Sequence, residues 1–445
     1  MFFPRGGSAH VARALAANLP SHGWDVTLVA GSRAESSPHG DARKFFHGLD
    51  LRPVDFDAGD APLHPSYEDR PGAADQVFAA VDDDTYERHV RAWARALDDA
   101  DAPSADVLHL HHLTPIHEAA ARVAPDVPVL THLHGTELLM LEAIADGAPW
   151  PHAAAWSRRM RRWARRSARL LVLAPSQVER VERLLGVGAD RCVVSPNGFD
   201  PDLFERRDVD RARHYRRHLV DHPRGWRPGH PEGSARYAPA QIAPLTRGPV
   251  AIAVSRFTAV KRLGLLVRAW AGAQRDRCLP ADASLVLLGG YPGEWEGEHP
   301  ADAIAASGAR NVFLAGWHGH DALPEFFGAA DLNVLASVRE QFGSVLVEGM
   351  ACELPAVAVN RFGPAAIIED GVTGWLVEPD DERALSAAIA AALTDPDERR
   401  RRGRRARRDA ADRFSWPALA GHLAALFDEV AGVADGHLAT PGTAA

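Results

Sequence analysis

The sequence predicts an α/β protein of two domains, each built on a doubly wound parallel sheet, that face each other across a cleft. Three observations predict this class. Apolar, strand-like runs alternate with amphipathic helical segments, a pattern typical of parallel sheets covered on both faces. The alternation stops after residue 203 and restarts near residue 250. The length of 445 residues also fits two domains of ordinary size.

The first half of the chain shows the alternation clearly, and residues 1–200 are assigned to an N-terminal domain. The expected helices span residues 8–19, 86–97, 154–168 and 176–185. The expected strands span residues 24–30, 106–111, 128–133, 169–174 and 192–195. Apart from the helix at 86–97, the region 31–105 gives no interpretable pattern.

The alternation returns in residues 248–412, which are assigned to a C-terminal domain. The expected strands span residues 250–255, 284–289, 311–315, 332–336 and 356–359. The expected helices span residues 263–275, 322–330, 344–353 and 382–393. Residues 201–247 are rich in Arg, His, Pro and Gly and predict a linker or an excursion. A last helix is expected at 415–432, where Leu419, Leu423, Leu426 and Val430 recur at helical spacing.

The composition is that of an ordinary globular protein, with 46% hydrophobic and 24% charged residues. A net charge of −9 argues against general nucleic-acid binding, which needs a basic surface. Cys192, Cys278 and Cys352 lie far apart, so neither a disulfide framework nor a zinc site is expected. This cysteine usage favours the cytoplasm. No apolar run is long enough to span a membrane, and the N-terminus lacks a signal-peptide pattern.

A segment between a predicted strand and a predicted helix carries the strongest chemical signal. A polar loop carries Glu340 and turns at Phe342-Gly343. The helix begins at Ser344, and Glu348 lies about one turn inside it. Unpaired amides of the first turn favour an anion near Gly343 and Ser344. The two carboxylates instead suit neutral hydroxyl groups, such as those of a ribose and a hexose. The alternative interpretation is two solvated surface charges.

This segment resembles glycosyltransferase family 4, whose Glu-x7-Glu motif matches Glu340 and Glu348. The resemblance continues at residues 196–200 (PNGFD), 316–317 (GW), 349–355 (GMACELP) and 369–377 (EDGVTGWLV). It covers most of residues 6–30, 106–200 and 248–390. It implies the GT-B fold, with two Rossmann-like domains and a C-terminal helix that crosses back to the first. It also implies a hexosyltransferase-type enzyme (EC 2.4) that moves a sugar from a nucleoside diphosphate to an acceptor hydroxyl with retained configuration.

Two cations follow a predicted strand of the C-terminal domain, Arg256 at its end and Lys261 at the entrance of the next helix. The resemblance implies that both bind the diphosphate leaving group. Of the 50 lysines and arginines only two are lysines, which favours a specific need for a compact ammonium at Lys261. The alternative is a pair of surface cations that neutralise neighbouring acids.

The resemblance implies further site residues in the N-terminal domain. His134, after the strand at 128–133, matches a histidine beside the donor sugar. Gly7 matches the glycine loop that precedes the first helix, where backbone approaches a ligand. His111 is equally compatible with a site role and a packing role, whereas His109 and His112 are interpreted as packing or surface groups. The implied contacts are ribose for Glu348 and the sugar for Glu340 and His134.

Two departures from the family pattern concern the two domains separately. Ala366 stands where the family usually has an acidic residue, four positions before Asp370. Only Met1–Arg5 precede the glycine loop, which is too short for a central strand, and Pro4 removes one donor from a strand ladder. We therefore expect an apolar strand encoded upstream of Met1, which in-frame translation of the upstream DNA tests.

Two charged segments have alternative interpretations. The basic helix Trp156–Leu171 is interpreted as a packed helix with a solvated basic face, with peripheral contact to an anionic membrane as the alternative. Asp82-Asp83-Asp84 contains the Asp-x-Asp string of a metal–nucleotide site, but helix capping explains it better.

The sequence thus predicts a nucleotide-sugar donor and an unidentified hydroxyl acceptor, with no cofactor, no metal site and no nucleic-acid partner. The expected location is the cytoplasm, with the inner face of the membrane as the alternative. Two rival functions remain. One is a GT-B-like phosphorylase, although nothing resembles a pyridoxal-phosphate lysine site. The other is a non-catalytic subunit that binds sugar nucleotides, which Ala366 and the missing first strand motivate.

Overall fold

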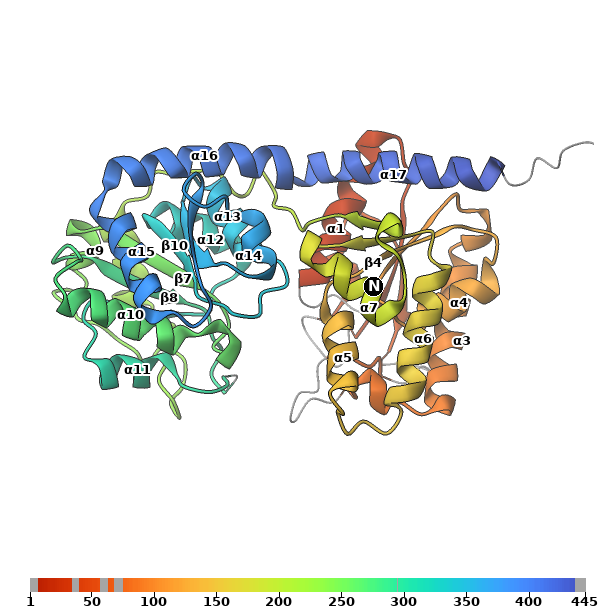
Figure 1. Cartoon of the computed structure of the whole chain (residues 1–445), viewed down its shortest axis with the longest axis horizontal. Helices are drawn as coiled ribbons and strands as arrows, with labels where there is room; N and C mark the ends of the chain where they lie inside the picture. The colour runs from red at the N-terminus through yellow and green to blue at the C-terminus, as the bar shows by residue number, and fades with distance from the viewer. Residues whose placement is uncertain (1–6, 34–39, 57–62, 68–74, 294, 437–445) are drawn as a thin grey trace, which may run out of the picture. The chain divides into compact units, whose positions relative to one another are not determined.

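The computed structural model describes residues 7–33, 40–56, 63–67, 75–293 and 295–436 (Figure 1). The chain divides into two compact units. The first comprises Met1–Asn197 together with Trp416–Ala445, and the second comprises Gly198–Ser415. The end of the chain therefore belongs to the first unit.

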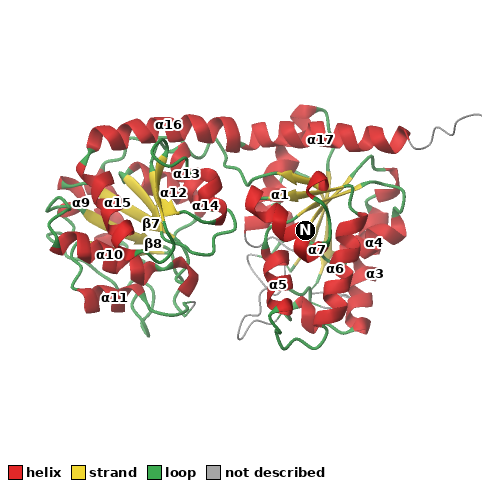
Figure 2. Ribbon diagram, viewed as in Figure 1, coloured by secondary structure: helices red, strands yellow, loops and turns green. Residues whose placement is uncertain are grey.

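Parallel strands flanked by helices build the first unit (Figure 2). Its helices are α1 (Gly7–Asn18), α2 (Ala42–Phe45), α3 (Asp83–Asp99), α4 (Ile116–Val123), α5 (Thr136–Ala145), α6 (Ala153–Arg166), α7 (Val178–Leu185) and α17 (Trp416–Gly436). Its strands are β1 (Thr27–Ser32), β2 (Asp50–Asp55), β3 (Leu108–His111), β4 (Val129–His132), β5 (Arg169–Val172) and β6 (Cys192–Val194). The described strands form two sheets, β1-β2 and β3-β4-β5-β6. The expectation about Met1–Arg5 lies outside the described residues.

Strand periodicity decides what covers each face of the larger sheet. Successive side chains of a strand point to opposite faces. Leu108 and Leu110 of β3 belong to the main apolar core of the unit, which also contains residues of α3, α4 and α6. His109 and His111 therefore occupy the other face, where the ring of His109 lies 5.6 Å from that of Phe427 in α17.

Helix α17 completes the first unit by covering this second face of the sheet. Leu419, Leu423 and Val430 are buried in one cluster with Val11 and Leu15 of α1. The cluster also contains Leu130 of β4 and Leu171 of β5. The apolar spacing of 415–432 thus forms a helix that returns to the N-terminal part of the chain.

The second unit is built on a single parallel sheet of six described strands. Its strands are β7 (Val250–Val254), β8 (Ser284–Leu288), β9 (Val312–Gly316), β10 (Leu332–Leu335), β11 (Ala356–Val359) and β12 (Gly374–Val377). Its helices are α8 (Arg211–Arg216), α9 (Pro244–Arg247), α10 (Leu263–Arg275), α11 (Pro300–Ser307), α12 (Leu323–Gly328), α13 (Ser344–Ala351), α14 (Phe362–Ile367), α15 (Glu382–Thr394) and α16 (Pro396–Phe414). A π-helical turn, Arg217–Asp221, continues α8.

The strand order of this sheet is β12-β11-β10-β7-β8-β9. Counted within the unit, this is the 3-2-1-4-5-6 order of doubly wound sheets, read from the other edge. The order reverses between β7 and β10, which pair in parallel. In such sheets a ligand binds outside the carboxyl ends of the strands at this reversal. The fold alone therefore directs attention to the loops that follow β7 and β10.

Residues 201–247, expected to be a linker or an excursion, are an ordered part of the second unit. The hydroxyl of Tyr215 donates to the carbonyl of Ala329 at 2.9 Å. The Trp226 indole stacks on Phe257 with 5.7 Å between ring centroids, and its N–H donates to Gly290. These buried aromatic side chains fix the segment to the sheet, so it does not act as a free tether.

The charged segments at 82–84 and 156–171 both have structural roles. Asp82 caps α3, because its carboxylate accepts from the amide of Thr85 at 2.7 Å. In α6, Trp156, Met160 and Trp163 are buried in the core, so its apolar face is already occupied. Among the described residues, no helix is long and apolar enough to cross a membrane. Strands β2 and β12 were not expected from the sequence.

Replacing Leu423 with Ala is expected to lower the free energy of unfolding by about 2–5 kcal/mol, because a cavity opens between α17 and the sheet. His422 is exposed on the same helix, so His422→Ala is the matched control and should change stability by less than about 0.5 kcal/mol. Urea unfolding followed by tryptophan fluorescence measures both. Equal effects of the two substitutions would contradict the packing of α17.

Candidate active site

The loops after β7 and β10 meet at the reversal point of the second unit. The amide of Val338 donates to the carbonyl of Val260 at 3.0 Å, and the Ser337 hydroxyl donates to the same carbonyl at 3.3 Å. The amide of Gly363, at the start of α14, donates to the carbonyl of Glu340 at 3.2 Å. These backbone contacts hold the segment 337–343 between the loop after β7 and the start of α14. The backbone positions from which its side chains extend are therefore fixed.

Helix α13 begins in this segment with amides that can receive an anion. Gly343 is its N-cap residue and makes no side-chain capping hydrogen bond. Its φ of 106° lies in the left-handed region, where a glycine is needed. A Cβ there would also lie 3.4 Å from Glu340 Cγ. The turn therefore depends on Gly343, and it leaves the first-turn amides of Ser344 and Val345 available to an anion.

Lys261 and Glu340 form an ion pair across the reversal point. Lys261 ends a short 3-10 turn after β7, and its Nζ contacts Glu340 Oε2. Each side chain retains 18% of its exposure, so the pair is reachable from solvent. From the sequence, Lys261 was expected to bind the diphosphate and Glu340 the sugar. The structure places the cation and the carboxylate in direct contact beside the amides of α13.

Glu348 lies on α13 and is 7% exposed. Its Oε1 lies 2.9 Å from Nε2 of His320, in the loop after β9. The imidazole of His320 also packs edge-on against Phe204, with 5.0 Å between ring centroids. His320 thus orients a carboxylate that has one oxygen left for a hydroxyl donor. Phe342 is buried against Phe414, at 5.9 Å, and supports the turn from the side.

Two further positions complete the picture of the second unit. Arg256 is exposed on the loop that follows β7, two residues beyond the strand. Ala366 lies on α14, and its carbonyl accepts from the guanidinium of Arg413 at 2.7 Å. The position where the family usually has an acid therefore carries no side-chain acceptor.

His134 belongs to the first unit, in the loop that joins β4 to α5. Its amide donates to Glu137 Oε2 at 3.1 Å, and its Nε2 lies 3.0 Å from Nδ1 of His111. Glu137 Oε1 in turn bonds His112 Nδ1 at 2.5 Å. Burial, reinforced by the neighbouring imidazoles, holds the pKa of His134 well below its ordinary value. A neutral imidazole of this kind can exchange hydrogen bonds with a sugar hydroxyl without carrying charge.

Gly7 is the first described residue of α1, and it is exposed. A Cβ at this position would meet nothing within 4 Å. The start of α1 therefore has open space beside its backbone. The preceding residue of the predicted glycine loop, Gly6, lies outside the described residues.

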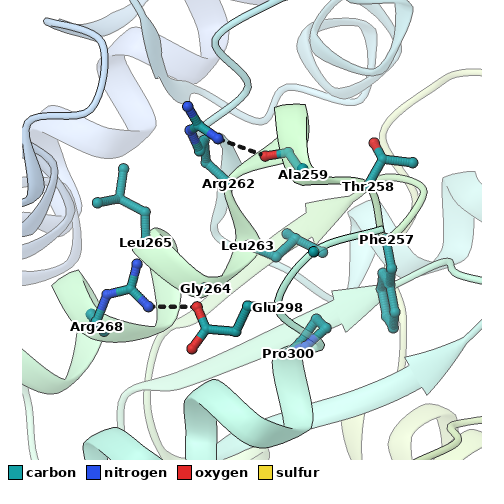
Figure 3. A pocket seen from close by; sticks show the side chains of 11 residues that line it. Phe257, Thr258, Ala259, Arg262, Leu263, Gly264, Leu265, Arg268, Glu298 and Pro300 are labelled. Atoms are coloured by element: carbon teal, nitrogen blue, oxygen red, sulfur yellow. Dashed lines mark hydrogen bonds and ion pairs between the residues drawn. The ribbon is translucent and has the colours of Figure 1, made fainter. Parts of the chain in front are cut away.

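A cavity of about 270 Å³ lies on the β7–α10 side of the second unit (Figure 3). Phe257, Thr258 and Arg262 line it from the loop after β7, opposite Glu298 and Pro300. Arg268 donates to Glu298 at 2.6 Å across its wall. None of the predicted site residues lines this cavity. Its loop is nevertheless the one that carries Lys261.

Sequence reasoning missed two contacts that orient predicted residues. His320 follows the Gly316-Trp317 pair by three positions, and only the packing of α13 shows that it bonds Glu348. Glu137 follows His134 by three positions, a spacing that signals a side chain folding back onto the loop. His112, interpreted as a packing or surface group, is buried as a packing group and also bonds this buried carboxylate.

Comparison with known protein families fits the geometry of both units. Residues 5–203 match the family described as Glycosyltransferase Family 4. Residues 238–409 match the family described as Glycosyl transferases group 1. The chain belongs to glycosyltransferase family 4. Its two α/β units are those of the GT-B fold.

Curated relatives resemble parts of the chain. The D-inositol 3-phosphate glycosyltransferase of Salinispora tropica is 34% identical over 189 residues, which are 41% of this chain and 39% of that protein. The enzyme of the same name from Xylanimonas cellulosilytica is 28% identical over 72% of this chain and 70% of its own length. The matched part of the chain thus spans about two fifths of the length of the Salinispora tropica protein.

Solved structures share the fold over nearly the whole chain. The sucrose-phosphate synthase of Thermosynechococcus elongatus has a TM-score of 0.64 at 19% identity and covers 97% of this chain and 95% of its own. HepE of Anabaena, in complex with UDP and glucose, has a TM-score of 0.66 at 18% identity and covers 96% of each chain. At these identities the likeness establishes the fold alone.

Replacing Gly343 with Ala is expected to cost about 1–3 kcal/mol, because the left-handed backbone becomes strained. Gly432→Ala is the control, since its Cβ would meet nothing within 4 Å and its helix should be slightly stabilised. Thermal unfolding of both variants measures the difference. A Gly343→Ala protein as stable as the wild type would show that the turn tolerates a side chain.

Proposed function

We propose that this chain is a retaining glycosyltransferase that moves a sugar from a nucleoside diphosphate to an acceptor hydroxyl. The observation that carries the proposal is the group of residues at the β7–β10 reversal. An ammonium, two carboxylates and free helix amides occur there together, at the place where doubly wound sheets bind nucleotides.

The cations and helix amides of the site are proposed to stabilise the leaving group. Departure of a nucleoside diphosphate leaves negative charge on its phosphate oxygens. Lys261, Arg256 and the amides of Gly343 and Ser344 stabilise that charge in the proposed complex, each charge-assisted contact contributing about 1.5–3 kcal/mol. On phosphate binding, Lys261 turns from Glu340 to the phosphate, which frees Glu340 to accept from a sugar hydroxyl.

The carboxylates of the site are proposed to bind the neutral hydroxyl groups of the donor. Glu348, held by His320, accepts from the ribose hydroxyls. Glu340 is proposed to accept from a hydroxyl of the transferred sugar, and His134 of the first unit is separately proposed to bond a sugar hydroxyl. The departing phosphate takes the proton of the acceptor hydroxyl, so no protein nucleophile is assigned. The reaction is proposed to need no cofactor and no metal ion.

The names of similar proteins support this proposal and narrow the first donors to test. HepE of Anabaena was solved with UDP and glucose. The relative from Salinispora tropica is named for a glycosyl transfer involving inositol 3-phosphate. We therefore propose UDP-hexoses as first candidates for the donor and a polyol or sugar as the acceptor. The free cysteines support the proposal that the protein acts in the cytoplasm.

The experiment that tests the function is a thermal-shift screen of UDP-, GDP- and ADP-sugars, followed by donor hydrolysis and transfer assays with the purified chain. Donor at 100 times its dissociation constant should stabilise the protein by about 2.7 kcal/mol. A donor that stabilises the chain without hydrolysis or transfer would indicate the non-catalytic subunit, which the missing acid at Ala366 favours. If none of the nucleoside-diphosphate sugars raises the thermal midpoint, the proposal is refuted.

Lys261→Ala is expected to lower turnover at saturating donor more than tenfold, because it removes charge stabilisation of the leaving group. Lys261→Arg should recover only part of the loss, since a planar guanidinium does not replace a compact ammonium. The adjacent Arg262 pairs with Asp380, so Arg262→Ala is the control and should retain activity. Retention of more than a tenth of wild-type turnover in Lys261→Ala would contradict the assignment.

Glu348→Gln is expected to raise the Michaelis constant for donor more than it lowers turnover, because ribose contacts exist in both the ground and transition states. Steady-state kinetics at varied donor concentration measure the two effects. His320→Gln should shift the same constant in the same direction, since His320 holds Glu348. Unchanged donor affinity with a lower turnover would place Glu348 at the reacting sugar instead.

A further inference from the structure

Three histidines of the first unit share one face of its larger sheet. His109 and His111 are two residues apart on β3, so their side chains lie on the same face. His132 of β4 is the direct register partner of His111. The ring centroids of His109 and His111 are 4.6 Å apart, and those of His111 and His132 are 5.2 Å apart. One nitrogen from each of the three residues lies within 4.8 Å of the others.

His111 and His132 are buried and His109 is half-buried, and some of their ring nitrogens lack ordinary partners. Within the described part of the chain, Nε2 of His109 makes no hydrogen bond, and the ring of His132 has only an interaction with the backbone of Ser195 that falls short of normal hydrogen-bond geometry. His132 is 1% exposed. Buried polar groups without partners are costly and call for an explanation such as an ion or a water. His117, on the other side of the same domain, shows the usual solution, with bonds to Thr114 and Thr131.

A neutral imidazole has one ring nitrogen with a lone pair that it can donate to a metal. Nδ1 of His111 is engaged by His134, which leaves Nε2 as the ligand atom of His111. Such an outer hydrogen bond is typical of metal-binding histidines.

We infer that His109, His111 and His132 bind one divalent transition-metal ion of the zinc type. Three imidazoles are a known zinc ligand set, and softer or harder ions prefer sulfur or carboxylate oxygen. Tetrahedral zinc, at about 2.0–2.1 Å from each nitrogen, draws the three ligand atoms closer by roughly an ångström. This site could not be predicted from the sequence, because the third ligand comes from the register of β3 with β4, which spacing along the chain does not reveal.

The site adjoins one residue of the proposed sugar transfer, because His111 bonds His134. Its ligands face α17, where the ring of His109 meets Phe427, and none is assigned to the donor. The ion would join β3 to β4 and hold the sheet face on which α17 packs. Metal stoichiometry and sugar transfer are measured in separate assays, so loss of the metal site and failure of the proposed transfer are distinguishable.

The test begins with the full chain freed of metal by chelation and dialysis. Titration with Zn²⁺ and with Co²⁺ is expected to show one bound equivalent per chain and a rise in thermal midpoint. The visible spectrum of the Co²⁺ form should have the intensity of a tetrahedral site. Absence of stoichiometric binding by this protein would overturn the inference.

Three matched variants locate the ion. His132→Phe keeps an aromatic ring but removes a ligand, and it should abolish binding of the equivalent. His89→Phe alters another buried histidine whose ring nitrogens lack partners but which belongs to no three-ligand group, so it should bind normally. His218→Phe disrupts the second such group among the described residues, His214, His218 and Glu325, and should also bind normally. If binding survives His132→Phe but is lost in His218→Phe, the ion binds in the second unit and the assignment is wrong.

X-ray absorption of the zinc-loaded wild-type protein decides the matter without relying on the folding of any variant. Three imidazole ligands without a carboxylate from the protein are expected at the proposed site. Two imidazoles with a carboxylate would match His214, His218 and Glu325 and would refute the assignment. A shell dominated by water oxygens would likewise refute it.

Discussion

The parallel pairing of β7 with β10 is the constraint on which the candidate site depends. These strands are far apart in sequence, and their pairing brings the loop that carries Lys261 against the loop that carries Glu340. Neither loop alone brings an ammonium and a carboxylate together at this place. The reversal of strand order between the two strands makes room for a ligand at their carboxyl ends. Charge, amide donors and hydroxyl acceptors then meet at one place.

The local chemistry of α13 adds selectivity to this place. A glycine in the left-handed region turns the chain into the helix, so the unpaired amides point out of the turn. Glu348 follows within the first turns of the helix and is buried enough to need a partner, which His320 provides. The candidate site therefore has amides suited to an anion and a carboxylate suited to a hydroxyl group on one short helix.

Much of this could be predicted from the sequence because it depends on local patterns. Apolar periodicity located α10 and α15 to within about one residue, and the Glu-x7-Glu spacing identified Glu340 and Glu348. The missed features depend on tertiary contacts. Strand β12 is a run of only four residues, and the folding of residues 201–247 onto the second unit follows from the burial of Tyr215 and Trp226. The histidine cluster requires knowledge of which residues face each other across β3 and β4.

The return of the chain to its first unit has a consequence for biosynthesis. Part of the hydrophobic core around β4 and β5 is supplied by α17, which is translated after the 218 residues of the second unit. At about 5–20 residues per second, the ribosome needs roughly 10–40 s to make that intervening part. The earlier-made unit therefore waits on the ribosome with an apolar sheet face uncovered, while the later-made unit already has its whole chain. The order of synthesis and the order of completion are reversed, and chaperones that shield apolar surface have their longest opportunity on the N-terminal half.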